Sequence, residues 1–130
     1  MERLGHCIAK LEALSELPRE RFTAHSDLRD IAERNFEIAA QCVIDIALRI
    51  LSVEQRPRAS TGAEAILALV PVGVLHAEQA HKLAPIANFR NILVHEYVSV
   101  DWDLVYEHFA ALDQLRDFAE AARGWLRNQP

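Results

Sequence analysis

Hydrophobic residues recur every three or four positions along most of the chain, which is the spacing of one buried face of an α-helix. The pattern predicts five helices and no strands, over about residues 2–17, 25–52, 61–70, 76–95 and 101–126. Long helices joined by short connections favour an up-and-down bundle. The sequence therefore predicts an all-α fold that forms one domain over residues 1–130.

Capping and helix-breaking residues set the expected helix ends. Pro18 should end the first helix, because proline has no backbone N–H with which to continue it. Ser26 or Asp27 should cap the second helix, since a short polar side chain accepts from the free amides of the first turn. Thr61 and Glu64 are three residues apart and match a capping box at the start of the third helix.

The buried faces follow from the same spacing. The second helix is apolar on almost every side between residues 38 and 47, so we expect burial against the bundle on one side and against a partner on the other. Asp101 should cap the last helix, and Trp102 and Trp125 should be packing or interface anchors. The expected core positions of the first, second and last helices are Leu4, Ile8, Leu11, Leu14 and Leu17; Leu28, Ile31, Ala32, Ala39, Val43, Ile46, Ala47 and Ile50; and Val105, Phe109, Leu112, Leu115 and Ala119.

Composition and charge narrow the functional classes. Hydrophobic residues make up 51% of the chain and charged residues 25%, which is typical of a folded globular protein. The formal net charge of −5 has the wrong sign for a protein that coats nucleic acid without specificity. Any RNA chemistry must therefore depend on a local basic spot, on a groove between two subunits, or on a weak encounter.

The two cysteines indicate a reducing compartment. Cys7 and Cys42 each lie within an apolar helical pattern, so we expect buried free thiols and no disulfide. No Cys–His spacing resembles a zinc site, and we expect no metal and no cofactor. The chain shows no signal peptide and no apolar run of membrane-spanning length, which predicts a cytoplasmic protein.

Residues 90–97, with the sequence RNILVHEY, break the apolar pattern around them. Asn91 and His95 are four residues apart and share one helical face, so the amide can orient the imidazole. Arg90 and His95 are five apart and diverge by about 140° on an ideal helix. These two side chains can converge if the helix unwinds near His95, or if a two-fold dimer gathers both residues from two chains into one groove. Tyr97 falls in the turn that follows.

An arginine and a histidine suffice to cleave RNA without a metal. Histidine has a pKa near neutrality, so it can deprotonate the 2′-hydroxyl or protonate the leaving 5′-oxygen. Arginine can hold the scissile phosphate and stabilise the charge of the transition state. Such a reaction would leave a 2′,3′-cyclic phosphate, and DNA, which lacks the hydroxyl, would not react.

Residue types alone also allow purely structural roles. His95 could satisfy a carbonyl at a helix end while Arg90 pairs with a surface carboxylate such as Glu96. Asp45, inside an apolar helix, could pair with an arginine near the groove or face solvent. Tyr106 is expected at an ordinary helical position.

The segment from Phe89 to Tyr97 resembles the R-x4-H-x-Y signature of HepT-like toxins in the HEPN superfamily of helical ribonucleases. The central helix, with Glu33-Arg34 leading into residues 44–47, is similar to that family's central helix. Residues 73–75 before the motif and Val100-Asp101 after it also fit, so the resemblance covers nearly the whole chain.

The resemblance implies a toxin of a type VII HepT/MntA toxin–antitoxin system that acts as a homodimer, with catalytic residues in a cleft between subunits. By position, Arg90 and His95 would be catalytic and Asn91 would support them. Tyr97 would be the residue to which the MntA nucleotidyltransferase antitoxin transfers AMP, and the added charge and bulk would block RNA. Further cations at the groove would come from Arg34 or Lys82. The rival interpretation is a non-catalytic HEPN module that binds a nucleotidyltransferase partner or its nucleotide substrate.

Overall fold

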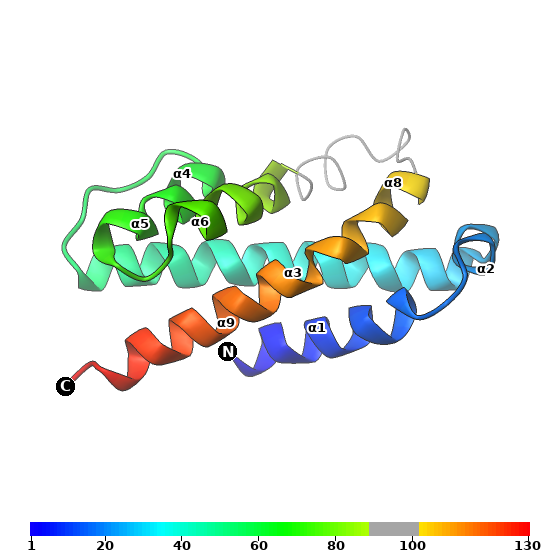
Figure 1. Ribbon diagram of the computed structural model, residues 1–130, viewed down its shortest axis with the longest axis horizontal. Helices are drawn as coiled ribbons and strands as arrows, with labels where there is room; N and C mark the ends of the chain where they lie inside the picture. Colours follow the sequence, from blue (N-terminus) through cyan, green and yellow to red (C-terminus); the bar gives the residue numbers. More distant parts are fainter. Residues whose placement is uncertain (89–101) are drawn as a thin grey trace.

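The computed structural model describes residues 1–88 and 102–130, and within them every regular element is a helix (Figure 1). The elements are α1 (Glu2–Ser15), α2 (Arg19–Ala24), α3 (Ser26–Val53), α4 (Gly62–Leu67), α5 (Leu69–Val72), α6 (Ala77–Leu83), α8 (Trp102–Glu107), the 3-10 helix η2 (His108–Ala111) and α9 (Leu112–Arg127). Residues 85–88 form a further helical turn. The all-α prediction is confirmed.

Helix α3 is the axis of the bundle (Figure 1). Its 28 residues span about 40 Å at 1.5 Å per residue, which is long enough for several other helices to pack along it. Helix α1 packs beside α3 and α9, α4 packs on another side of α3, and α6 contacts both α4 and α9. The described helices therefore pack around α3.

The core follows the predicted spacing with four exceptions. The expected core residues of the last helix are all buried, and Leu4, Ile8, Leu11 and Leu14 of α1 are also buried. Leu17, Leu28 and Ile46 are only partly buried. Ile31 on α3 is 44% exposed, so the assignment of Ile31 to the core was wrong. Ile31 lies in the second turn of α3, where the bundle that covers the middle of the helix leaves one side open to solvent.

The caps of α3 differ from the prediction, although its length does not. The helix begins at Ser26 with His25 as its N-cap, and no side chain caps it, so neither Ser26 nor Asp27 has the predicted role. Pro18 does end the first helical region, but it also precedes α2, which the sequence pattern did not predict. Phe22 of α2 is fully buried, so a single aromatic side chain holds this short helix against the bundle.

The predicted helix over residues 61–70 is two helices. Thr61 caps α4 as expected, with its hydroxyl accepting from the N–H of Glu64 at 3.1 Å. The Glu64 carboxylate accepts chiefly from the backbone N–H and the hydroxyl of Ser60, at 2.9 and 2.7 Å. The chain turns at Ala68 and restarts as α5, which places Pro71 in a first turn, where its missing N–H costs nothing.

The predicted last helix is also interrupted, by η2 between α8 and α9. Phe109 of η2 contacts the rings of Phe22, Phe36 and Tyr106, at centroid distances of 5.4, 5.5 and 5.4 Å. Among the described helices, none is both long and apolar enough to span a lipid bilayer.

Candidate functional site

The predicted site residues Arg90, Asn91, His95 and Tyr97 lie outside the described residues, as does the predicted cap Asp101. Their roles stay predictions. The structure does describe both sides of this segment. We call α6 with residues 85–88 the leading side, and α8 with η2 the trailing side.

The leading side is packed tightly against the rest of the bundle. Ile86 and Ala87 are 5% and 4% exposed. A Cβ atom on Gly62, the first residue of α4, would lie 2.7 Å from Cδ1 of Ile44 and 3.2 Å from Cβ of Ala87. A larger residue at position 62 would therefore force the Ile44 side chain to shift and would press on Ala87. The chain enters the motif from a fixed point, three residues before Arg90.

The start of helix α6, which leads towards the motif, is stabilised by a capping hydrogen bond. The backbone N–H of His76 donates to Oε1 of Gln79 at 2.9 Å, which satisfies a free amide at the helix start. Lys82, a predicted groove cation, pairs with Glu78 at 3.1 Å, where both side chains are exposed. Lys82 also lines a hollow of about 290 Å³ between the leading side and η2.

The trailing side is held by an arginine stacked on a tryptophan. The guanidinium carbon of Arg29 lies 5.2 Å from the ring centroid of Trp102, which is cation–π distance. The Nε of Arg29 is buried and has no hydrogen-bond partner within residues 1–88 and 102–130. Trp102 is an anchor, as predicted, and it stands five positions after Tyr97 in the sequence.

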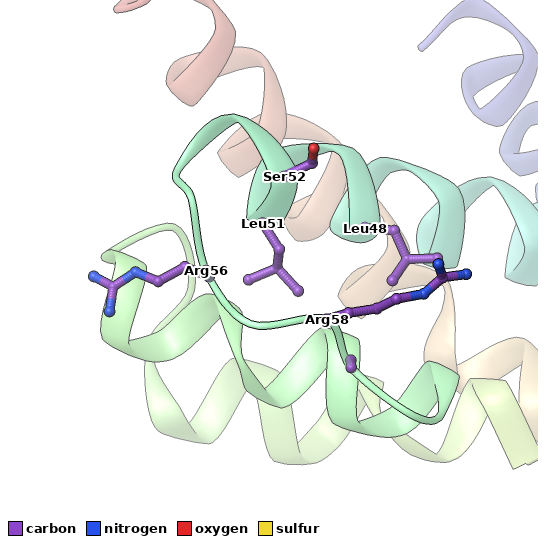
Figure 2. Close-up of a pocket in the computed structure, with 6 residues that line it drawn as sticks. Leu48, Leu51, Ser52, Arg56 and Arg58 are labelled. Carbon is purple, nitrogen blue, oxygen red and sulfur yellow. The ribbon is translucent and has the colours of Figure 1, made fainter.

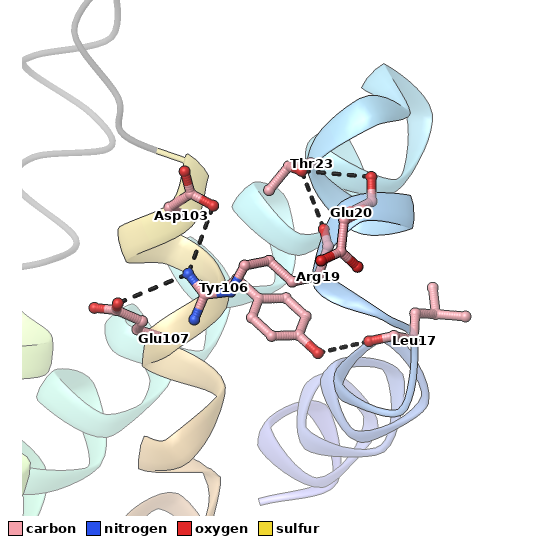
Figure 3. A network of polar contacts seen from close by, with 7 residues as sticks. All are labelled: Leu17, Arg19, Glu20, Thr23, Asp103, Tyr106 and Glu107. Atoms are coloured by element: carbon pink, nitrogen blue, oxygen red, sulfur yellow. Dashed lines mark hydrogen bonds and ion pairs between the residues drawn. The ribbon is translucent and has the colours of Figure 1, made fainter.

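Tyr106 is the second anchor of the trailing side (Figure 3). Its hydroxyl donates to the backbone carbonyl of Leu17 at 2.6 Å, across 89 residues of sequence. The Arg19 guanidinium lies 5.1 Å from the Tyr106 ring and within 3.5 and 3.7 Å of the carboxylates of Asp103 and Glu107. The assignment of Tyr106 to an ordinary helical position was incomplete, because this side chain joins α8 to the turn between α1 and α2.

The described cations predicted near the site do not come together. Arg34 lines an exposed hollow of about 270 Å³ with Arg3, Glu37 and Asp45, among others, whereas Lys82 lies on α6. Asp45 faces solvent, and its carboxylate accepts from Nε2 of Gln41 at 2.7 Å. Of the two alternatives for Asp45, the solvent-facing one is therefore observed.

Two polar residues of α3 are buried, and sequence reasoning did not single out their burial. Glu33 and Asn35 are 8% and 7% exposed. Nδ2 of Asn35 donates to the carbonyl of Ile31 at 2.8 Å. Glu33 also has a partner, as a buried carboxylate must. Their burial could have been predicted from the sequence, because Glu33 and Asn35 are next to Ala32 and Phe36 on the buried face of the helix.

The cysteines are free, as predicted, although Cys42 is only half-buried. Burial raises the pKa of both thiols, so they are protonated at neutral pH and are poor nucleophiles. Within the described part of the chain, no group of three or more His, Cys, Asp or Glu side chains is placed to hold a metal ion.

A basic hollow lies at the connection between α3 and α4, a stretch that the sequence pattern indicated only as a linker (Figure 2). Its volume is about 280 Å³, and its walls are Leu48, Leu51, Ser52, Arg56, Arg58 and Ala59. Figure 2 shows the two arginine side chains leaving the chain in opposite directions, with Leu51 between them. The Arg-Pro-Arg sequence at residues 56–58 was visible as a basic stretch. Only the fold shows that it lies over the last turns of α3.

Comparison with solved structures identifies the class of fold. A tri-AMPylated HEPN toxin of Shewanella oneidensis, solved in complex with an MNT antitoxin, superposes with a TM-score of 0.85 at 19% identity and covers 95% of this chain and 92% of its own. A toxin–antitoxin structure with AMP-PNP gives 0.82 at 19% identity, covering 93% and 92%. At these identities the likeness shows the fold, which is that of HEPN toxins.

Sequence comparison defines the family. The sequence profile described as ribonuclease HepT-like matches residues 4–122, and the chain belongs to this family. A curated relative named tRNA nuclease HepT, from Aphanizomenon flos-aquae, is 29% identical over 106 residues, which are 82% of this chain and 72% of the relative. The region that the profile matches includes the segment from Arg90 to Tyr97.

Proposed function

We propose that this chain is a metal-independent endoribonuclease toxin of a toxin–antitoxin system, with Arg90 and His95 as catalytic residues. The observation that carries the proposal is the family match over residues 4–122, which contains the whole R-x4-H-x-Y motif. The relative named as a tRNA nuclease makes transfer RNA the first substrate to test.

The proposed reaction uses the nucleophile that RNA carries. One His95 accepts the proton of a 2′-hydroxyl, whose oxygen attacks the adjacent phosphorus while the bond from phosphorus to the 5′-oxygen breaks. A second His95, from the other subunit of a homodimer, protonates the departing 5′-oxygen. Arg90 stabilises the negative charge on the phosphate, and Asn91 orients the imidazole. The products are a 2′,3′-cyclic phosphate and a 5′-hydroxyl.

We further propose that a nucleotidyltransferase antitoxin of the MntA type binds this chain and attaches AMP to Tyr97. The support is the Shewanella structure, whose HEPN toxin is described as tri-AMPylated and bound to its MNT antitoxin. Each AMP adds a negative phosphate near Arg90 in the sequence, so it would compete with the RNA phosphate for that cation.

Single substitutions test the catalytic assignment. Arg90→Ala and His95→Ala should each abolish growth arrest and tRNA cleavage by the purified protein. Circular dichroism and size-exclusion chromatography with light scattering should show that both variants remain folded dimers. Tyr106→Phe is the matched control for Tyr97→Phe: AMP transfer, followed as a gain in intact mass, should survive the first substitution and disappear with the second.

A non-catalytic HEPN module is the second candidate. The net charge of −5 favours it, because it leaves little general attraction for RNA. The outcome that selects this module is a folded wild-type dimer that binds its nucleotidyltransferase but neither arrests growth nor cleaves tRNA at high concentration.

A further inference from the structure

The basic hollow at the α3–α4 connection lies close to the point where the chain enters the motif. Leu48 in its wall is four residues from Ile44, which is about 6 Å along α3. Ile44 is one of the two side chains, with Ala87, that crowd Gly62. The nearest wall residue of the hollow, Leu48, is therefore about one helical turn from Ile44, and the other wall residues lie further towards the C-terminal end of α3 and along the connection to α4.

The hollow offers cations that the described protein does not neutralise. Arg56 and Arg58 are exposed, and neither takes part in an ion pair within residues 1–88 and 102–130. Among the other described arginines, four pair with carboxylates, Arg19, Arg116, Arg123 and Arg127, and five do not, Arg3, Arg21, Arg29, Arg34 and Arg49. In a protein of net charge −5, two such arginines beside one hollow are a local spot at which a polyanion can bind.

The backbone that carries these arginines is fixed by hydrogen bonds. The N–H of Arg56 donates to the carbonyl of Leu51 at 2.9 Å, and Gln55 adopts a left-handed conformation with φ of 56°. This is the geometry of a Schellman motif, which ends α3 and directs the chain back over its last turns. Pro57 then fixes φ between the two arginines. The backbone at Arg56 is thus fixed before any ligand arrives, and the two arginine side chains leave it on either side of the hollow.

The walls of the hollow suit a nucleotide unit of a strand. Leu48, Leu51 and Ala59 form an apolar floor, on which a base or sugar can pack. Because the guanidinium groups point in opposite directions, they cannot clamp one phosphate together (Figure 2). They can contact two phosphates of a strand that crosses the hollow.

We propose that the basic hollow is a phosphate-binding site for the RNA strand, separate from the scissile linkage, with Arg58 and Arg56 as its cations. This inference rests on the proposed ribonuclease function, and it assigns these residues to substrate positioning, not to chemistry. Arg58, which precedes the turn into α4, is the nearer of the two along the chain to Gly62.

Binding is measured apart from cleavage, with full-length His95→Ala protein and a fluorescein-labelled 12-nucleotide RNA of mixed sequence. Arg58→Ala should raise the Kd about 5- to 10-fold at 0.1 M salt, and the slope of log Kd against log salt should fall by about 0.7 for the lost phosphate contact. Arg56→Ala should act in the same direction, and the double variant should lose both contacts. Lys10→Ala, which removes the same charge from α1, should change the Kd less than about twofold.

Cleavage then separates positioning from catalysis. In the otherwise wild-type protein, Arg58→Ala should raise the KM for tRNA by a similar factor and leave kcat within about twofold. Loss of kcat at unchanged KM would contradict the proposal. So would unchanged RNA affinity with loss of antitoxin binding, which would make the hollow a protein-docking site. Micromolar binding of free AMP that depends on Arg58 would make it a mononucleotide site instead.

These experiments distinguish failure of the proposed ribonuclease function from failure of the proposed phosphate site. If wild-type protein cleaves no RNA while Arg58→Ala still weakens binding of the 12-nucleotide RNA, the hollow binds RNA in a non-catalytic module. If cleavage is intact and neither arginine affects Kd, KM or the salt slope, the ribonuclease stands and the phosphate site is rejected.

Discussion

The leading and trailing sides of the motif segment are fixed by different kinds of contact. The leading side is held by shape, because Ile44, Gly62 and Ala87 meet with no space for another methyl group. The trailing side is held by directional contacts, in which Tyr106 bonds to Leu17 and Arg19 bridges α2 to α8. Steric packing tolerates changes of salt and pH, whereas ion pairs on the surface do not. The two sides should therefore respond differently to substitution and to solvent.

Overpacking the leading side should have the largest effect. Gly62→Val places side-chain atoms where Ile44 and Ala87 already lie, and we expect it to lower the free energy of unfolding by about 2 kcal/mol. Urea denaturation measures this. Gly124→Ala in α9 is the matched control: a Cβ there meets only Arg127 at 3.9 Å, so the change should stabilise by about 0.5–1 kcal/mol. Equal stability of wild type and Gly62→Val would show that this contact can relax.

Removing one hydrogen bond from the trailing side should have a smaller effect. Tyr106→Phe keeps the ring contacts with Phe22 and Phe109 but loses the bond to the carbonyl of Leu17. We expect a loss of about 1 kcal/mol by urea denaturation, because a half-buried hydrogen bond is removed and its acceptor is left without it. A loss near zero would mean that water replaces the hydroxyl at this carbonyl.

The ion pairs around Arg19 should contribute still less to the free energy of unfolding. Arg19→Met keeps an apolar stem over the Tyr106 ring and removes the contacts with Asp103 and Glu107, whose side chains are 65% and 59% exposed. We expect a loss of about 0.5 kcal/mol at 0.05 M salt, and most of it should disappear at 1 M salt. The Gly62→Val effect should not depend on salt, and a parallel dependence would contradict the distinction between the two sides.

The smallest effect should come from the polar cap of α4, the helix against which the leading side packs. The hydroxyl of Ser60, which donates to Glu64 at 2.7 Å, holds the pKa of that carboxyl below its usual value. A carboxylate with a lowered folded-state pKa contributes stability above its unfolded pKa, and the contribution is lost as pH falls through the folded value. Glu64→Gln should therefore melt slightly below wild type at pH 7, and the two melting temperatures should converge near pH 3. A constant difference across this range would exclude Glu64 ionisation as the cause.

The sequence predicted α3 well because its hydrophobic signal is repeated many times. Over 28 residues of α3, the apolar spacing was sampled for more than seven turns, and the expected range of 25–52 differs from Ser26–Val53 by one residue at each end. The short α2 carries its burial on Phe22 alone, which is too little for a periodic pattern. The break at Ala68 was not predicted because Pro71 was interpreted as the end of a helix, although proline is also common in the first turn of a helix.

The candidate site also has features that the sequence predicts and features that only the fold creates. The residue types and spacing of Arg90, His95 and Tyr97 were readable because a chemical motif is local in sequence. The Tyr106–Leu17 bond joins residues 89 positions apart, and no local pattern encodes it. The basic hollow likewise exists only because the Schellman turn at Gln55 folds Arg56 and Arg58 back over α3.

The sequence by itself determined the helical class, the central helix and the motif that marks the family, because hydrophobic periodicity and residue chemistry act over short stretches of chain. Tertiary structure alone decided which glycine must stay small, which tyrosine anchors the chain after the motif, and which arginines remain without carboxylate partners in the described residues. Those properties depend on distances between segments far apart in the sequence, and packing sets these distances.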